Sequence, residues 1–459
     1  MRSTIHRRGS TWNSFSVSLC TTSNPQPPSS KAHSPSGAPS YAPSTQSRFR
    51  RGNSSLLAFG RRVLLVALVV LIACGCKETH EDAPATDRSP RQTHDDAPDV
   101  TGRLPTDRPT YLDVALQDVL VLGADVSAPP EYLFGWPGFV DTDSEGRIYV
   151  ADIGMMTVKV YDAEGHYLHT IGARGQGPGE MLSIKAMYVN DKDQLLLYDR
   201  NNERVTRFAA DGAVLNQYSV PNIMNSMKIR MHFLGMHHLL LFSGIPGESS
   251  NEHIFHLVSP DFQEVVASFG DAGAVRQSDK LLDKILLSSL PGQFVVADSD
   301  IVHVPGLYSG SLHRYKKEQG QWVLNGVHHG YVETTSPYKE IAPEAPYADY
   351  RLSNSSNESF AVLAYNKSRG LFRLQDGRLV HFTFCKFGDE RVFGVEIFDQ
   401  SGKLIGYGPI RSVPWDTNKK FLVNWDVVGK DDQDRFYIID EEDIPVVRVV
   451  EVRYQLASS

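Results

Sequence analysis

Short apolar stretches that alternate with polar residues recur from about residue 110 to the end of the chain, separated by turns that contain Asp and Gly. The segment Trp136–Gly172 holds four of them, among them Arg147–Asp152 and Tyr167–Ile171. Alternation with a period of two, bounded by turn residues, is typical of short β-strands. The segment therefore predicts a unit of four antiparallel strands.

The segment that follows repeats this pattern at one fixed offset of 47 residues. The offset pairs Asp152 with Asp199, Tyr161 with Phe208 and Gly165 with Gly212. A repeat of this length is typical of the blades of a propeller. Four later units, in 228–270, 294–327, 376–402 and 421–452, keep the strand rhythm with less sequence similarity.

The last unit has only three strands, and an incomplete blade would leave a sheet edge exposed and the ring open. Tyr111–Leu122 is strand-like and has no other partner, so we expect it to complete the last blade as its outermost strand. Its alternation changes phase near Gln117, which indicates a β-bulge. The predicted fold is all-β: a six-bladed β-propeller of four-stranded antiparallel blades, closed by an N-terminal strand, with short helical or irregular inserts.

Two segments interrupt the rhythm between blades. Ser278–Leu287 carries apolar residues at helical spacing, and Tyr331–Ser359 is too long for an ordinary connection. Long loops on a rigid scaffold are where binding residues concentrate. The candidate ligand contacts are the inter-blade residue Arg174 and the aromatic residues Trp322, Tyr338, Tyr347 and Tyr350. The alternative is that the aromatic residues only pack the inserts and that the loop around Arg174 only connects blades.

The N-terminal part predicts export and lipidation. Arg61 and Arg62 precede the eleven apolar residues Val63–Ala73, whereas a membrane-spanning helix needs roughly 20. The run has the size of the apolar region of a secretory signal. It ends in Leu71–Cys76, which resembles a bacterial lipoprotein box with Cys74 as the lipidated residue and Cys76 as the second choice. The alternative is a plain secretory signal or a short anchor helix.

These features divide the chain into four parts. Residues 1–60 are either a low-complexity leader or the result of a translation start that is assigned too early. They also resemble an organelle transit peptide. Residues 61–76 are the lipoprotein signal, 77–109 a disordered tether, and 110–459 the propeller. The expected location is the bacterial cell envelope, at the outer membrane.

The charge argues against one class of partner, and the cysteine content argues against a disulfide framework. Nine of the 46 Lys and Arg residues lie before residue 77, and all 54 Asp and Glu residues lie after it, so the rest of the chain carries a formal charge of −17. Such a domain repels phosphate backbones, so no nucleic-acid partner is expected. Four cysteines, with Cys385 alone in the predicted propeller, make no disulfide framework. A monomer is expected.

No motif predicts a catalytic residue, a metal or a cofactor. Asp141–Asp152 has the spacing of a calcium loop but lacks flanking helices, so a turn is favoured over a calcium site. Gly172–Gly179 lacks the Lys-Ser/Thr ending of a phosphate loop. The propeller part is rich in histidines, but none recurs at one blade position, so no zinc ligands can be assigned.

Two stretches carry a resemblance to a known family. Arg147–Asp152 and Asp199–Phe208, followed by Gly212, resemble NHL repeats, and Gly175–Glu180 resembles a loop of six-bladed propeller lipoproteins from Bacteroidetes. The resemblance covers the first two blades and implies the fold rather than an activity. Some NHL-type propellers, such as peptide-amidating lyases, hold zinc at the central channel.

Two hypotheses for the function follow. The favoured one is a lipid-anchored scaffold that binds a protein, peptide or glycan through one face of the ring. The alternative is a metal-dependent hydrolase or lyase with its site at the central channel, which three or more convergent His, Asp or Glu side chains would favour.

Overall fold

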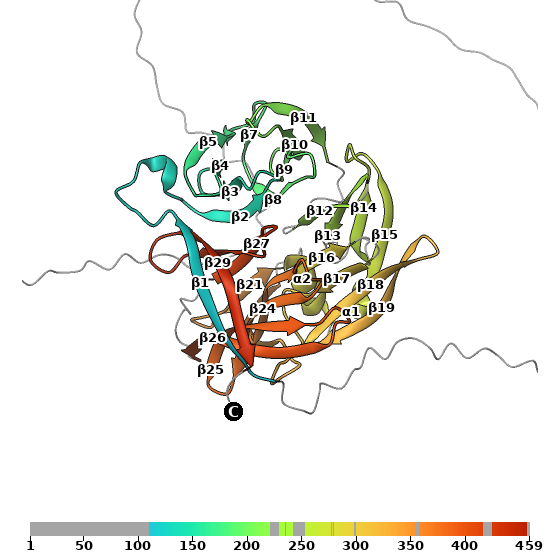
Figure 1. Ribbon diagram of the computed structural model, residues 1–459. Helices are drawn as coiled ribbons and strands as arrows, with labels where there is room; N and C mark the ends of the chain where they lie inside the picture. The colour runs from blue at the N-terminus through green and yellow to red at the C-terminus, as the bar shows by residue number, and fades with distance from the viewer. Residues whose placement is uncertain are drawn as a thin grey trace, which may run out of the picture. The chain divides into compact units, whose positions relative to one another are not determined.

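The computed structural model describes residues 110–220, 229–234, 236–241, 253–276, 278, 280–297, 300–353, 358–415 and 425–456. Strands dominate these residues, and they form six four-stranded antiparallel sheets arranged as blades around a common centre (Figure 1). The segments predicted to be the lipoprotein signal (61–76), the tether (77–109) and the leader (1–60) lie outside the described residues.

The first three blades follow one another along the chain, each starting with its innermost strand. Blade 1 contains β2 (Pro137–Thr142), β3 (Ile148–Asp152), β4 (Thr157–Tyr161) and β5 (Tyr167–Ile171). The short strands β6 (Ala173–Arg174) and β7 (Glu180–Met181) pair in the connection to the next blade. Blade 2 contains β8 (Ile184–Val189), β9 (Leu195–Asp199), β10 (Arg204–Phe208) and β11 (Val214–Ser219). Blade 3 contains β12 (Arg230–Leu234), β13 (His237–Leu241), β14 (His253–Val258) and β15 (Val265–Asp271).

The last three blades are built in the same way. Blade 4 contains β16 (Gln293–Ala297), β17 (Asp300–Val304), β18 (Ser311–Glu318) and β19 (Gln321–His329). Blade 5 contains β23 (Asn366–Arg373), β24 (Leu379–Phe387), β25 (Glu390–Phe398) and β26 (Leu404–Pro414). Blade 6 contains β27 (Trp425–Lys430), β28 (Phe436–Asp440), β29 (Val446–Leu456) and, as its outermost strand, β1 (Leu112–Leu122).

Strand β1 closes the ring as the sequence predicts. It pairs antiparallel with β29, from Leu112 opposite Leu456 to Leu122 opposite Val447. The register shifts between Asp118 and Leu120, close to the predicted bulge. Both ends of β1 are buried, because Leu112 and Leu122 are each 4% exposed. The first and last described strands are therefore held together in one blade.

The repeated aspartates Asp152 and Asp199 fix the start of the inner strands of blades 1 and 2. Asp152 accepts hydrogen bonds from the backbone N–H groups of Gly135 (2.7 Å) and Trp136 (3.0 Å), which precede β2, and also binds the turn after β3. Asp199 accepts the equivalent pair ahead of β8 at 2.7 and 2.9 Å. A buried backbone donor left without a partner is costly, so an acceptor at this position stabilises the connection between blades.

The hydrophobic core lies between neighbouring blades. One cluster, for example, packs Tyr149 and Val158 of blade 1 against Leu197 and Phe208 of blade 2, all at most 1% exposed. Similar clusters fill the spaces between the other blades. Each sheet therefore buries both of its faces, and removing one blade would expose two apolar surfaces.

The two faces of the ring carry different loops. Because neighbouring strands in a blade run antiparallel, the loop between the second and third strands lies at the same face as the connection to the next blade. We call this the connection face. The opposite face carries the turns between the first and second and between the third and fourth strands, and we call it the hairpin face.

The two inserts are connections between blades, so both lie at the connection face. The first contains α1 (Ala272–Val275) and α2 (Leu281–Ser289), which confirms a helix in the expected place. The second forms a small sheet of β20 (Tyr338–Ile341), β21 (Tyr350–Ser353) and β22 (Ser359–Ala364), where only an irregular loop was expected. Figure 1 shows α2 near the middle of the ring.

The two inserts pack on each other as one unit. Leu282, Ile285 and Leu286 of α2 share a core with Leu352 and Val362 of the insert sheet. The Tyr338 hydroxyl donates a hydrogen bond to Asp283 at 2.6 Å and so joins the sheet to the helix. Among the described residues, no helix is long and apolar enough to cross a membrane.

Candidate functional site

Charged residues stand near the start of several inner strands, at the connection face. Lys185 is the second residue of β8, Arg230 the first of β12 and Asp426 the second of β27. Arg369 is the fourth residue of β23. The four residues come from four different blades, and their inner strands border the centre of the ring. We call these four residues the channel cluster.

The electrostatics of the channel cluster centre on Asp426. The Arg369 guanidinium donates to the Asp426 carboxylate at 2.6 Å. Burial alone would lower the pKa of Arg369, but Asp426 and Tyr350 outweigh burial and raise it. Arg230 is also attracted to Asp426, although blades 3 and 6 stand opposite each other in the ring. Asp426 thus forms an ion pair with Arg369 and exerts a longer-range attraction on Arg230.

Arg230 and Lys185 are the weakly compensated members of the cluster. Within the part of the chain that the structure describes, the Arg230 guanidinium has no hydrogen-bond partner, and the side chain is half-buried. Burial lowers the pKa of Arg230, and the attraction to Asp426 only partly opposes this effect. Burial, with a smaller contribution from Arg200, also lowers the pKa of Lys185. The cluster therefore holds more positive than negative charge in a partly desolvated place.

The insert sheet brings an aromatic ring to the cluster. Tyr350 lies under the Lys367 ammonium, 5.0 Å from its ring centroid, and interacts with both Arg369 and Asp426. Burial lowers the pKa of Lys367 to about 8, although the Asp349 carboxylate opposes this shift. Asp349 itself binds Lys367 at 2.6 Å and Arg391 at 2.7 Å. These ion pairs fix the insert to blade 5.

Asp349 is the anchor of this contact. Burial would raise the pKa of its carboxyl group, but Lys367 and Arg391 outweigh burial and hold the pKa well below its usual range. The Arg391 guanidinium also stacks on Trp415 at 4.3 Å and donates to the Ala364 carbonyl at 2.7 Å. A buried ion pair with this many hydrogen bonds fixes a unique position for the insert rather than adding much stability.

The structure brings some of the sequence-predicted contact residues together and separates others. Tyr347 donates to Asp349 at 3.1 Å, and Tyr338 and Tyr350 lie in the same insert sheet. Arg174 donates to the Gly154 carbonyl at 2.8 Å, away from the insert. Trp322 stacks on Phe269 at 5.5 Å between the outer strands of blades 3 and 4. Their roles in ligand binding stay predictions.

The channel cluster was missed in the sequence, although a signal for it exists. Lys185, Arg230 and Asp426 all occupy the first or second position of an inner strand. Aligning the six inner strands at their observed starts places these charges at one level of the ring. Arg369 would have stayed less certain, because a β-bulge at its position shifts the register of β23.

The histidines of the propeller are mostly buried structural residues. Burial lowers the pKa of His303 to about 3 and the pKa values of His238, His313 and His328 to about 4, so these rings are neutral at pH 7. In the described ranges, no three His, Cys, Asp or Glu side chains stand close enough together to hold a metal ion.

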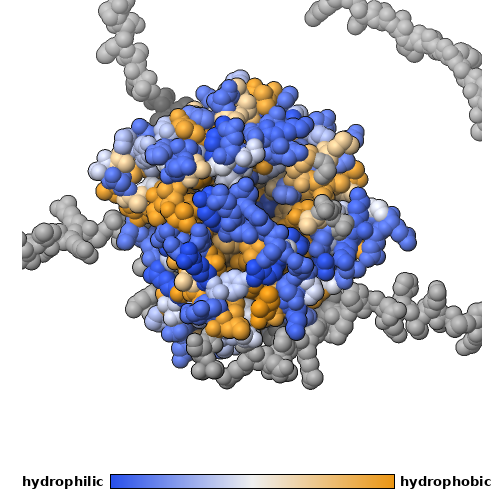
Figure 2. Space-filling view, in the orientation of Figure 1, coloured by the Kyte–Doolittle hydropathy of each residue, from blue (hydrophilic) through white to orange (hydrophobic). Residues whose placement is uncertain are grey.

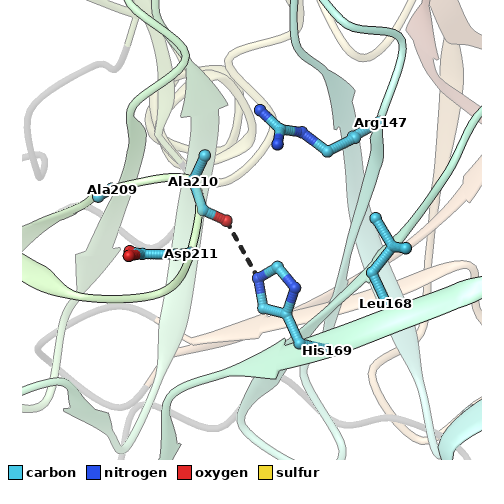
Figure 3. Close-up of a pocket in the computed structure, with 6 residues that line it drawn as sticks. All are labelled: Arg147, Leu168, His169, Ala209, Ala210 and Asp211. Carbon is cyan, nitrogen blue, oxygen red and sulfur yellow. Dashed lines mark hydrogen bonds between the residues drawn. The ribbon is translucent and has the colours of Figure 1, made fainter.

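An open groove of about 600 Å³ lies apart from the channel cluster, between the outer parts of blades 1 and 2 (Figure 3). His169 of β5 is already hydrogen-bonded to the Ala210 carbonyl at 3.0 Å, as the dashed line shows. Arg147 is bound by Asp143 at 2.6 Å and by Glu145 at 3.2 Å. Because its polar groups are engaged, this groove is a weaker candidate than the channel cluster.

The face seen in Figure 2 is mostly hydrophilic, with hydrophobic side chains in separate patches. Large hydrophobic residues are exposed singly or in adjacent pairs on several outer strands, such as Leu168 of β5 and Val265–Val266 of β15. Scattered exposure of this kind is ordinary for a protein surface. The charge of the channel cluster therefore distinguishes it better than hydrophobicity does.

A match to a family model supports the fold. The profile of a family described as 6-bladed beta-propeller matches residues 131–234. No curated protein matches the chain. A solved structure of an exported protein from Bacteroides fragilis is 12% identical, with a TM-score of 0.47, and the match covers 78% of this chain and 98% of that one.

Two further solved structures are similar in the same way. A protein of a family of unknown function from Bacteroides vulgatus is 12% identical, with a TM-score of 0.47, over 76% of this chain and 100% of that one. A gluconolactonase from Xanthomonas campestris is 11% identical, with a TM-score of 0.38, over 76% of this chain and 99% of that one. The six four-stranded blades and the family match together show that the protein is a six-bladed β-propeller.

Proposed function

We propose that this protein is an envelope-anchored binding propeller that recognises an anionic group of a peptide, protein or glycan at the channel cluster. The observation that carries the proposal is that the Arg369 guanidinium is paired with Asp426, whereas Arg230 has only a longer-range attraction to the same carboxylate. This excess of positive charge stands in a chain whose part after residue 76 carries a formal charge of −17. The local charge is thus opposite to that of its surroundings.

The physical case rests on desolvation. A half-buried guanidinium without a hydrogen-bond partner loses hydration and gains little in return. A carboxylate or phosphate oxygen placed between Arg230 and Arg369 would restore those hydrogen bonds in the planar geometry that guanidinium groups favour. Such charge-assisted hydrogen bonds contribute about 1.5–3 kcal/mol each. The insert adds the Tyr350 ring beside Lys367, two residues before Arg369, where it would limit the shape of a ligand that reaches the cluster.

The experiment is calorimetric titration of the purified propeller with citrate and with a glutamate-rich peptide at low ionic strength, and with neutral glucose for comparison. Saturable binding of an anion is expected, weakened at least about tenfold by Arg230→Ala and by added salt. Arg453→Ala is the matched control, because this arginine is exposed on the outer strand β29. Absence of anion binding, or equal weakening in both variants, would refute the proposal.

We further propose that the mature chain is lipidated at Cys74, or at Cys76 in its place, after the apolar segment Val63–Ala73. The support is the sequence alone, since these residues lie outside the described part. Radioactive palmitate fed to expressing bacteria should label the protein, and the double change of Cys74 and Cys76 to Ser should abolish the label. Labelling that survives in the double variant would show that the lipid is attached elsewhere.

A further inference from the structure

Three side chains of blade 5 form a hydrogen-bonded line across neighbouring strands. Ser368 lies on β23, His381 on β24 and Glu396 on β25. The distance from Ser368 Oγ to His381 Nε2 is 3.0 Å, and the distance from His381 Nδ1 to Glu396 Oε2 is 2.7 Å. His381 and Glu396 are completely buried. A serine, a histidine and a carboxylate in this order match a nucleophile, a general base and the group that orients the base.

The surroundings of Glu396 fix the direction of the hydrogen bonds. Its carboxylate also accepts from the Tyr308 hydroxyl at 2.9 Å and from the backbone N–H of Tyr331. With these donors aimed at it, Glu396 acts as an acceptor toward His381 Nδ1–H. The other ring nitrogen, Nε2, then presents its lone pair to the Ser368 hydroxyl. This is the tautomer that lets a histidine remove the proton from a serine.

Ser368 is placed where a substrate could reach it. The residue is half-buried, whereas its two partners are closed off, and it lies on the innermost strand of its blade. The register of β23 against β24 shifts between Ser368 and Gly370, which marks a β-bulge. Bulges redirect side chains and occur often beside active sites.

We propose that Ser368 is the nucleophile of a serine-hydrolase site that cleaves carboxylic esters. Ser368 Oγ attacks the carbonyl carbon while His381 Nε2 takes the hydroxyl proton. The bond from that carbon to the alcohol oxygen breaks, and His381 gives its proton to the leaving alcohol. Water then attacks the acyl-serine ester, His381 takes a proton from the water, and this proton returns to Ser368 Oγ as the carboxylic acid leaves.

This activity goes beyond ligand binding at the channel cluster and needs neither a metal nor a cofactor from outside. Glu396 is a positioning residue, because it acts through His381 and touches no substrate. Its effect should therefore fall on the turnover number and on the pH profile of hydrolysis rather than on substrate binding. Without the Glu396 carboxylate, the proton could move from His381 Nδ1 to Nε2. Nε2 would then no longer accept the proton of Ser368.

The first test needs no variant. The purified wild-type propeller is treated with a neutral fluorophosphonate probe, and the labelled peptide is identified by mass spectrometry. Covalent labelling of Ser368 is expected. Absence of label from the folded protein, or label on another residue, would overturn the proposal. Because the probe is uncharged, this result does not depend on whether the channel cluster binds anions.

The second test measures hydrolysis of p-nitrophenyl acetate. Ser368→Ala and His381→Gln should each lower kcat about a thousandfold or more, and Glu396→Gln should lower kcat while KM stays nearly constant. Ser268→Ala is the matched control: this exposed serine also hydrogen-bonds to a histidine, but to Nδ1 of His256, at 2.9 Å. Ser268→Ala should hydrolyse the ester as fast as the wild type does. Equal activity in Ser368→Ala and the wild type would overturn the proposal.

Discussion

At the scale of single residues, Gly330 determines how closely blade 4 approaches the buried carboxylate of blade 5. The residue follows β19, and the next backbone N–H, that of Tyr331, donates to Glu396. A Cβ at position 330 would meet the Tyr308 hydroxyl and both carboxylate oxygens of Glu396 at distances that real side chains do not reach. The backbone conformation of Gly330 is an ordinary one with negative φ, so the requirement for glycine is steric.

We predict that Gly330→Ala destabilises the propeller by about 1–3 kcal/mol, the usual cost of forcing an extra carbon into a packed interior. Chemical unfolding followed by tryptophan fluorescence measures the change. Gly326→Ala is the control, because this glycine of β19 has open space where a Cβ would stand. Similar stability of the two variants would mean that the backbone at Gly330 moves aside without cost.

At the scale of elements, β1 closes the ring. Its side chains Leu112 and Leu122 are buried in two different clusters, one between blades 5 and 6 and one between blades 6 and 1. The Arg448 guanidinium of β29 also binds Asp118 at 2.9 Å. Without β1, β29 would become an unpaired edge strand, and both clusters would lose the β1 side chains packed against them.

A chain that starts at Thr110 should therefore fold like the longer protein, because it keeps all of β1. A chain that starts after Gly123 should aggregate or melt with low cooperativity. Light scattering behind a sizing column and a thermal melt distinguish the two products. If the shorter chain stays monomeric and melts at the same temperature, β1 is not required for closure.

The sequence predicted the regular elements and missed those that depend on distant contacts. The bulge near Gln117 was visible because the alternation of β1 changes phase there, and α2 was visible because its leucines follow a helical spacing. The insert sheet was not predicted. Its strands β20 and β21 are four residues long, and their pairing with β22 depends on burial against α2, which no local pattern encodes.

At the scale of the whole molecule, both candidate sites arise from the ring itself. Arg230 and Asp426 are almost two hundred residues apart in sequence, and only the closure of six blades places them opposite each other. Ser368, His381 and Glu396 come from three neighbouring strands, yet no sequence motif joins them, because the register of the blade sets their alignment. The sequence pattern therefore predicted the propeller fold, whereas the two candidate sites depend on how its strands are aligned.

Ring closure by β1 also gives the propeller a polarity. As the outermost strand of its blade, β1 runs from the hairpin face to the connection face, where the chain continues into β2. Thr110, just before β1, and Leu456, paired with Leu112, therefore both lie at the hairpin face. A lipid tether of about 33 residues would have a root-mean-square reach of roughly 30 Å. If the chain is anchored through this segment, the hairpin face would lie toward the bilayer, and the inserts, the channel cluster and Ser368 would lie on the side that faces away from it.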